Sequence, residues 1–139
     1  MDIYPNSIHI SRVVFRMSER SKKLLDDMQK KRGYIYPPYK LLALEDSDFL
    51  EAYDRLYELV MPRERIFPEK IKELFYIVAI ASRNPSDNEA LKNHVRRALD
   101  KGAKKGEIVE ALQCAFFPGG ALSLLYGLKV LMEVLEEKK

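Results

Sequence analysis

PEKIKELFYIVAIAS, residues 68–82, is the stretch that decides the fold. Pro68 suits the first position of a helix, where its missing backbone N–H leaves no hydrogen bond unmade. From Leu74 onward apolar residues occupy every side of that helix, which is typical of a helix buried at the centre of a protein. One acidic residue, Glu73, stands at the edge of the apolar run. We therefore expect a helical protein built around residues 68–82.

Start and stop signals predict further helices on both sides of this stretch. Ser18 is a favoured N-cap and Gly33 a favoured helix end, so a helix is expected between them. Apolar residues recur at helical spacing in four more stretches, residues 45–61, 86–102, 105–117 and the segment after Gly120. The class is therefore all-α, with about six helices in a single domain over residues 1–139.

The local signals also predict caps, a connector and an arm. Asp48 with Glu51, and Ser86 with Glu89, match the spacing of a capping box. Residues 34–40 are expected to be a connector, because Pro37 and Pro38 disfavour a regular helix there. Residues 1–17 are rich in β-branched side chains and predict a short strand or an extended arm.

Composition excludes several classes of protein. The net charge is +3 and acidic and basic residues are interspersed, so no nucleic-acid partner is expected. The chain opens on no signal peptide, and its most apolar stretch, residues 74–81, is too short to cross a bilayer. The single cysteine, Cys114, excludes an intramolecular disulfide and favours a cytoplasmic location.

Neither the cysteine nor the histidines predict a metal or a cofactor. Cys114 is expected to be a small buried apolar residue, and His9 to be exposed on the N-terminal arm. His9 and His94 stand on separate segments without metal-ligand spacing, so we expect no metal site. Several helices carry apolar residues on more than one face, which predicts burial against other copies in a homo-oligomer.

Four stretches in order resemble the carboxymuconolactone decarboxylase family, which includes the alkylhydroperoxidase D-like proteins. They are residues 46–60, 67–81, 94–112 and 114–137, and they carry the paired residues Lys72 and Glu73, then His94, Gly102, Glu107 with Ile108, and Gly119 with Gly120. The resemblance implies an alkylhydroperoxidase D-like helical bundle over residues 36–139, preceded by an arm and helix over residues 1–35. It also implies a trimer or a hexamer.

The peroxidase chemistry of that family is excluded on chemical grounds. In the peroxidase branch a Cys-x-x-Cys pair precedes the histidine, and the matching positions here are Asp87 and Ala90. A peroxide reductase needs one thiolate to attack the peroxide and a second thiol to resolve the sulfenic acid. Cys114 alone cannot do both.

Glu73 and His94 are the candidate catalytic residues. Each stands about 15 Å along its helix from the turn that joins residues 68–82 to residues 86–102, so their side chains can meet across the helical hairpin. A carboxylate can orient an imidazole and leave its other nitrogen free for proton transfer.

The resemblance implies the use of that proton: a lyase that removes CO2 from a small carboxylated lactone and then protonates the resulting enolate. Basic residues would bind the substrate carboxylate, and Arg83 and Arg97 are assigned that role, with Lys92 and Arg96 as further candidates on charge alone. The alternative is a non-catalytic oligomeric scaffold or binding protein, in which His94 is a hydrogen-bonded core residue and Glu73 only favours the positive end of its helix.

Overall fold

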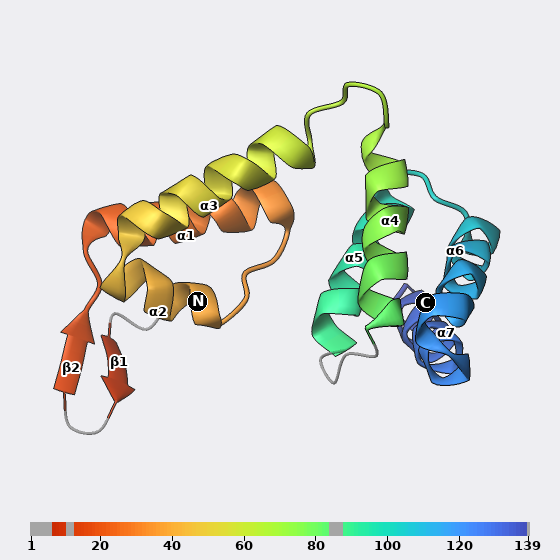
Figure 1. The fold of residues 1–139 in the computed structure, drawn as a ribbon. Helices are drawn as coiled ribbons and strands as arrows, with labels where there is room; N and C mark the ends of the chain where they lie inside the picture. The colour runs from red at the N-terminus through yellow and green to blue at the C-terminus, as the bar shows by residue number, and fades with distance from the viewer. Residues whose placement is uncertain (1–6, 11–12, 84–87, 139) are drawn as a thin grey trace. The chain divides into compact units, whose positions relative to one another are not determined.

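The computed structural model describes residues 7–10, 13–83 and 88–138, and confirms the all-α class (Figure 1). Within these residues the helices are α1 Glu19–Arg32, α2 Pro38–Glu45, α3 Ser47–Val60, α4 Glu69–Ser82, α5 Asn88–Asp100, α6 Lys105–Gly119 and α7 Ala121–Glu136. An antiparallel hairpin of β1 Ser7–Ile10 and β2 Val13–Arg16 precedes them. The helices divide between two compact units, Met1–Val60 and Met61–Lys139.

The first unit packs α1, α2 and α3 together, and the hairpin lies at the end where α1 begins. Ser18 is the N-cap of α1, as predicted, and its Oγ accepts the backbone N–H of Ser21 at 3.1 Å. Gly33 ends α1 with a φ of +78°, a conformation that favours glycine. The buried apolar residues of this unit are Met17, Leu25, Met28, Ala43 and Leu50.

The connector predicted over residues 34–40 is partly wrong, because α2 begins at Pro38. Pro37 and Pro38 stand at the N-cap and the first helical position, where no intrahelical partner exists for the N–H that proline lacks. This short helix raises the number from the expected six to seven within the described residues.

The capping box predicted for Asp48 and Glu51 is also wrong. The carboxylate of Asp46, one turn before Phe49, accepts the Phe49 backbone N–H at 3.0 Å. Asp48 and Glu51 instead both bind Arg20 of α1, at 2.6 and 2.5 Å. The other predicted box includes Ser86, which lies outside the described residues, as does the side chain of His9.

A buried ion pair joins α1 to α3 in the first unit. Arg32 is buried and binds Asp54, also buried, at 2.8 Å, and its guanidinium lies 4.1 Å from the ring centroid of Tyr57. Burial is the strongest single influence and opposes the charge of Arg32, but the hydrogen bond to Asp54 and the nearby charges of Asp54 and the tyrosines together raise its pKa. This pair belongs to the core of the first unit.

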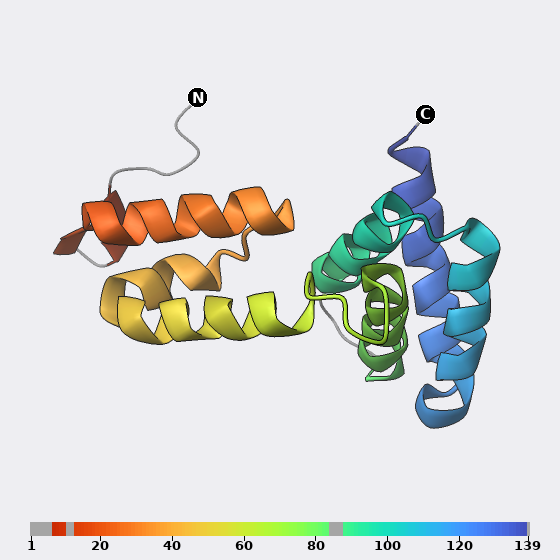
Figure 2. The ribbon, with the colours of Figure 1, turned by 90° about the horizontal axis from the view of Figure 1, so that it is seen from above.

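The second unit is a four-helix arrangement with α4 at its centre, packed against α5, α6 and α7. Figure 2 shows α6 and α7 side by side. Its buried apolar core is formed by Ile77, Ala81, Leu91, Val95, Ala98, Ala103, Ile108, Leu112, Ala115, Val130, Leu131 and Val134. The central position predicted for residues 68–82 is correct.

The expectation that α4 is buried all round is wrong, because Phe75 and Tyr76 are each more than one-third exposed. The packing of the three neighbouring helices leaves one face of α4 open. Within the described ranges, no helix is both long and apolar enough to cross a membrane.

Two glycines shape the junction of α6 and α7. Gly120, between them, has a φ of +82°, a backbone conformation that residues other than glycine rarely adopt. Gly127 of α7 faces Leu112 of α6 so closely that a Cβ on the glycine would lie 2.2 Å from Leu112 Cδ2. The small residue therefore sets how closely these two helices approach.

Candidate functional site

The candidate site lies between α4 and α5, where both helices bury polar residues along with apolar ones. On α4 the buried residues recur every fourth position, and on α5 they follow the pattern of one helix face: Glu69, Glu73, Ile77 and Ala81, facing Leu91, His94, Val95 and Ala98. Residues spaced by three or four positions share one side of a helix. Glu73 and His94 therefore lie on the same buried helix faces as the apolar residues of the core.

The side chains of Glu73 and His94 meet directly. His94 Nδ1 lies 2.7 Å from Glu73 Oε2. The side chain of Glu73 is 0% exposed and that of His94 is 9% exposed. A carboxylate only accepts hydrogen bonds, so an ionised Glu73 makes this contact with the imidazole proton on Nδ1. Within the described residues, no group hydrogen-bonds the other nitrogen, Nε2.

Arg97 extends the pair into a chain of alternating charge. Its Nε donates to Glu73 Oε1 at 2.7 Å, and its terminal nitrogen Nη2 donates to Glu69 Oε1. Lys101 lies 2.8 Å from the second oxygen of Glu69. A buried charge is stable only when it is paired, and here each acidic group has a basic partner.

One aromatic ring covers the imidazole. The rings of Tyr76 and His94 are stacked, with centroids 4.6 Å apart and planes inclined by 9°. Tyr76 is 39% exposed, so it stands between the imidazole and solvent. The site thus holds an oriented imidazole against an aromatic face, and an imidazole held through one nitrogen can exchange a proton through the other.

The other predicted substrate-binding residues do not gather at this site. Arg83 is exposed and follows the last residue of α4, about 15 Å along the axis from Glu73. Lys92 binds Glu133 of α7 at 2.8 Å, and this contact raises the pKa of Lys92. Arg96 binds Glu137 at 2.7 Å and its pKa is raised mainly by that hydrogen bond. Of the four cations, only Arg97 contacts the Glu73–His94 pair.

Sequence reasoning missed Glu69, Lys101 and Tyr76, although one signal was available. Glu69 and Glu73 are four residues apart, and so are Arg97 and Lys101. Like charges at this spacing repel each other on one helix. Two acids facing two bases across a predicted hairpin therefore indicate an interhelical charge cluster.

Hollows are also present elsewhere in the described part of the chain. One, of about 420 Å³, is an apolar groove between α4 and α6, lined by Leu74, Phe75, Val78, Ala79, Ala111 and Cys114. It lies on a different face of α4 from Glu73, and His94 does not line it. Cys114 is exposed there, so the prediction that it is buried is wrong.

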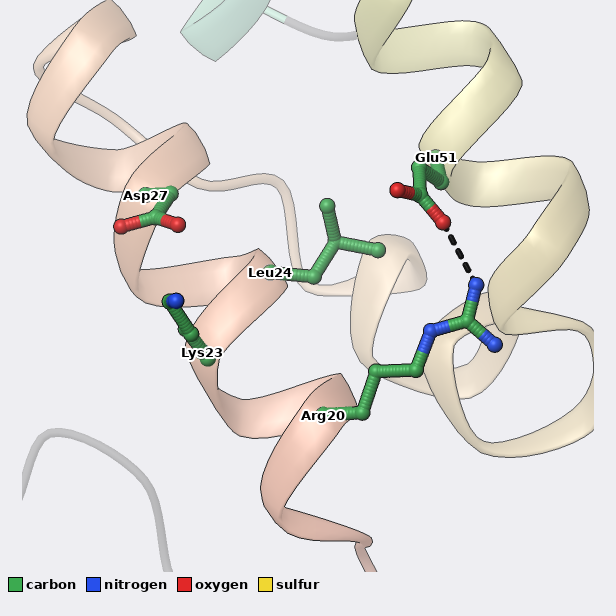
Figure 3. A pocket seen from close by; sticks show the side chains of 5 residues that line it. All are labelled: Arg20, Lys23, Leu24, Asp27 and Glu51. Carbon is green, nitrogen blue, oxygen red and sulfur yellow. Dashed lines mark hydrogen bonds and ion pairs between the residues drawn. The ribbon is translucent and has the colours of Figure 1, made fainter.

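The second hollow, of about 260 Å³, lies in the first unit between α1 and α3 (Figure 3). It is lined by Arg20, Lys23, Leu24, Asp27 and Glu51, and Arg20 points across it to Glu51. Both members of that ion pair are more than half exposed, so solvent screens their charges. This hollow has none of the desolvated, oriented groups that the Glu73 site has.

The described residues include one of the two positions that the peroxidase cysteines occupy, and most of the side chains that could ligate a metal. Ala90 lies in α5 at one position of the peroxidase cysteines, and Asp87, at the other, lies outside the described residues. Among the residues that the structure describes, no group of three or more His, Cys, Asp or Glu side chains is arranged to hold a metal ion.

Comparisons with known proteins agree with this architecture. A protein from Burkholderia xenovorans LB400 named as a carboxymuconolactone decarboxylase has a similar fold, with a TM-score of 0.73 and 20% identity over 86% of this chain and 92% of that chain. A carboxymuconolactone decarboxylase family protein from Legionella pneumophila aligns with a TM-score of 0.62 and 18% identity over 88% of this chain and 100% of that chain. Among curated protein sequences, none matches.

At these identities the solved structures establish the fold alone. The family model decides membership, because it matches residues 47–133, more than half of the sequence. The matched residues include Glu73, His94 and Arg97. The chain belongs to the carboxymuconolactone decarboxylase family.

Proposed function

We propose that this protein is a small-molecule lyase that uses His94 for acid-base catalysis, with Glu73 orienting the imidazole. One observation carries the proposal: His94 Nδ1 is held 2.7 Å from a fully buried carboxylate. A histidine that is oriented through one nitrogen has the other available to exchange a proton with a bound molecule.

The proposed reaction is decarboxylation of a small carboxylated, unsaturated lactone. The bond between the ring carbon and the carboxylate breaks, CO2 leaves, and the electron pair of that bond enters the conjugated system as an enolate. His94, protonated at both nitrogens, then gives the Nε2 proton to carbon and recovers it from solvent. The substrate loses a carboxylate and gains one hydrogen, so atoms and charge balance.

Binding of a substrate carboxylate needs a cation close to His94. Arg97 is the nearest of the predicted candidates, but its guanidinium already binds Glu69 and Glu73. Tyr76 is stacked on His94 and is partly exposed, so its ring borders the imidazole. We propose Tyr76 as a substrate contact of the lyase.

The test compares His94→Gln with His9→Gln, which changes the only other histidine in the sequence. A panel of carboxylated unsaturated lactones is assayed for CO2 release and for ligand-induced thermal shift. If the protein is a lyase, the His94→Gln variant should fold but lose turnover, and the His9→Gln variant should keep full activity. A His94→Gln protein that keeps the turnover of the wild type would refute the catalytic role.

A non-catalytic scaffold is the second candidate, favoured by the low exposure of the His94 side chain. In that case His94 and Glu73 only satisfy each other inside the protein. The scaffold expects no lactone in the panel to react with the wild type or to raise its melting temperature, and it expects His94→Gln to lower stability. For either candidate we propose the cytoplasm as the location, on the ground of the single cysteine.

We further propose that the protein is a homo-oligomer that buries the outer face of α3. Phe49, Tyr53, Leu56 and Val60 recur at spacings of four, three and four residues and are 42–61% exposed. Such a seam is typical of one helix packed on another. Each of these four side chains exposes roughly 100 Å² of surface. Together they supply about half of the ~800 Å² that each partner buries in a stable interface.

The oligomer proposal is tested by light scattering after gel filtration. Leu56→Glu places a charge in the seam and should reduce the mass to that of a smaller assembly. Arg55→Glu, an equally exposed charge change on the same helix, should leave the mass unchanged. A wild-type protein that is monomeric at high concentration would refute the proposal.

A further inference from the structure

Arg97 contacts the Glu73–His94 pair through the carboxylate of Glu73. The two oxygens of Glu73 have different partners: Oε1 accepts from Arg97 Nε and Oε2 lies against His94 Nδ1, each at 2.7 Å. The last torsion of a glutamate side chain is broad and only weakly restricted. The contact with Arg97 therefore restricts the rotation of the carboxylate that faces the imidazole.

Arg97 is itself held from both sides. Its Nε binds Glu73 on the inner side, and its terminal nitrogen binds Glu69, whose second oxygen binds Lys101. The side chains of Arg97 and Glu69 are 12% and 9% exposed, whereas Lys101 is 44% exposed. The chain thus runs from the protein surface to the imidazole with alternating charge, and the planar guanidinium is its rigid central member.

The same contact decides which hydrogen bond Glu73 can make. In an apolar interior a carboxyl group is more stable when neutral than when charged, unless a cation pairs with it. A neutral Glu73 could donate to Nδ1, and the imidazole proton would then be on Nε2. A Glu73 paired with Arg97 only accepts, and the imidazole proton must be on Nδ1.

We propose that Arg97 is the positioning residue of the site, which keeps Glu73 as an acceptor and so holds His94 in the tautomer with the proton on Nδ1. The neutral ring then has an unprotonated Nε2, which takes up from solvent the proton that the lyase step gives to carbon. This inference rests on the proposed function only for its catalytic consequence, because the tautomer is a property of the protein without substrate.

The experiment measures the ring ¹⁵N shifts of His94, which distinguish a protonated from an unprotonated nitrogen. The full-length chain is labelled at histidine, and the His94 signals are identified as those that vanish in His94→Gln; only His9 contributes others. At a pH where the ring is neutral, the wild type should show a protonated Nδ1 and an unprotonated Nε2.

The decisive variant is Arg97→Met, which keeps an unbranched side chain but removes the guanidinium. We expect the proton to shift toward Nε2, with a partial shift in Arg97→Lys, because one ammonium cannot make both planar contacts. Arg96→Met is the matched control: its guanidinium binds Glu137, so the His94 tautomer should not change. Folded Arg97→Met protein with unchanged His94 shifts would overturn the proposal.

A variant that weakens Arg97 indirectly covers the case in which Arg97→Met does not fold. Glu69→Gln leaves the guanidinium in place but removes its outer anchor, and it should produce a smaller shift toward Nε2. A Glu69→Gln protein that keeps the wild-type shifts would count against the proposal as strongly.

The catalytic consequence has its own readout. On a lactone that the wild type converts, Arg97→Met should lower kcat on the order of 10²-fold with KM nearly unchanged, as expected for a misplaced catalytic group. A wild type that turns over no lactone but shows the Arg97-dependent tautomer would refute the lyase and leave the positioning role intact.

Discussion

Replacing Glu73 with glutamine tests directly whether this buried carboxylate holds the two helices together. Glu73→Gln keeps the size of the side chain and removes its charge, so any effect comes from the contacts with Arg97 and His94 rather than from packing. Both contacts are 2.7 Å long and shielded from solvent. The amide can accept from only one of the two partners at full strength.

The expected cost follows from the number and kind of bonds that are weakened. A hydrogen bond to a charged group contributes roughly 1.5–3 kcal/mol, and breaking a buried ion pair costs about 3–5 kcal/mol. Since Arg97 keeps Glu69 as a partner, we expect the lower end, about 3 kcal/mol. With a urea dependence of about 2 kcal/mol per molar for a small protein, the unfolding midpoint should fall by about 1.5 M.

The assay is urea unfolding followed by far-ultraviolet circular dichroism, because the sequence contains no tryptophan. Glu110→Gln, on the exposed side of α6, is the matched control and should change the free energy of unfolding by no more than about 0.5 kcal/mol. A Glu73→Gln midpoint within about 0.3 M of the wild type would show that Glu73 does not hold buried charges.

Three other predictions test packing, the first unit and pH. Gly127→Ala should lower the melting temperature, because overpacking against Leu112 costs about 1–3 kcal/mol and the higher helix propensity of alanine returns only about 1 kcal/mol. Gly106→Ala, with nothing within 4 Å of its new Cβ, should raise the melting temperature. Equal shifts in the two variants would contradict the packing argument. Asp54→Ala removes the carboxylate that pairs with the buried Arg32, so the free energy of unfolding in urea should fall by about 3–5 kcal/mol. A decrease below about 1 kcal/mol would contradict the structural role of this ion pair. The backbone N–H at the N-cap of α6, and then Lys70, lower the pKa of Glu107 below its ordinary 4.5. The ionised Glu107 therefore stabilises the fold above pH 4.5, and this stabilisation is lost as the pH falls through the lowered pKa. Glu107→Gln should weaken the dependence of stability on pH in that range, and an unchanged dependence would contradict the cap.

The absence of the paired thiols changes what this site can do, but it does not remove the oriented imidazole. Glu73 and His94 form their contact without any help from sulfur. Cys114, the single thiol in the sequence, lines an apolar groove on another face of α4. The acid-base proposal therefore depends on groups that are independent of the missing peroxidase residues.

Local signals in the sequence were enough for most of the helix boundaries. The Ser18 cap and the Gly33 end depend on neighbouring backbone groups, so residue type and order predict them. Pro68 was predicted at the first helical position and is instead the N-cap, one residue before α4 begins. The meeting of Glu73 and His94 was also predictable, because two arms of a hairpin have a fixed rise per residue. The same local reasoning was wrong at Pro37 and Pro38, where two prolines began a helix instead of excluding one.

The rotation of one helix against another was decided only by the tertiary structure. It turned Arg97 toward Glu73 and Arg96 toward α7, although the two arginines are neighbours in the sequence. It also left Cys114 and one face of α4 exposed. Helical periodicity predicts which residues share a face, but the partner of that face depends on packing among helices that are distant in the chain. For this reason the sequence by itself determined most of the helices and the acid-imidazole pair, and only the folded arrangement decided which cation contacts that pair.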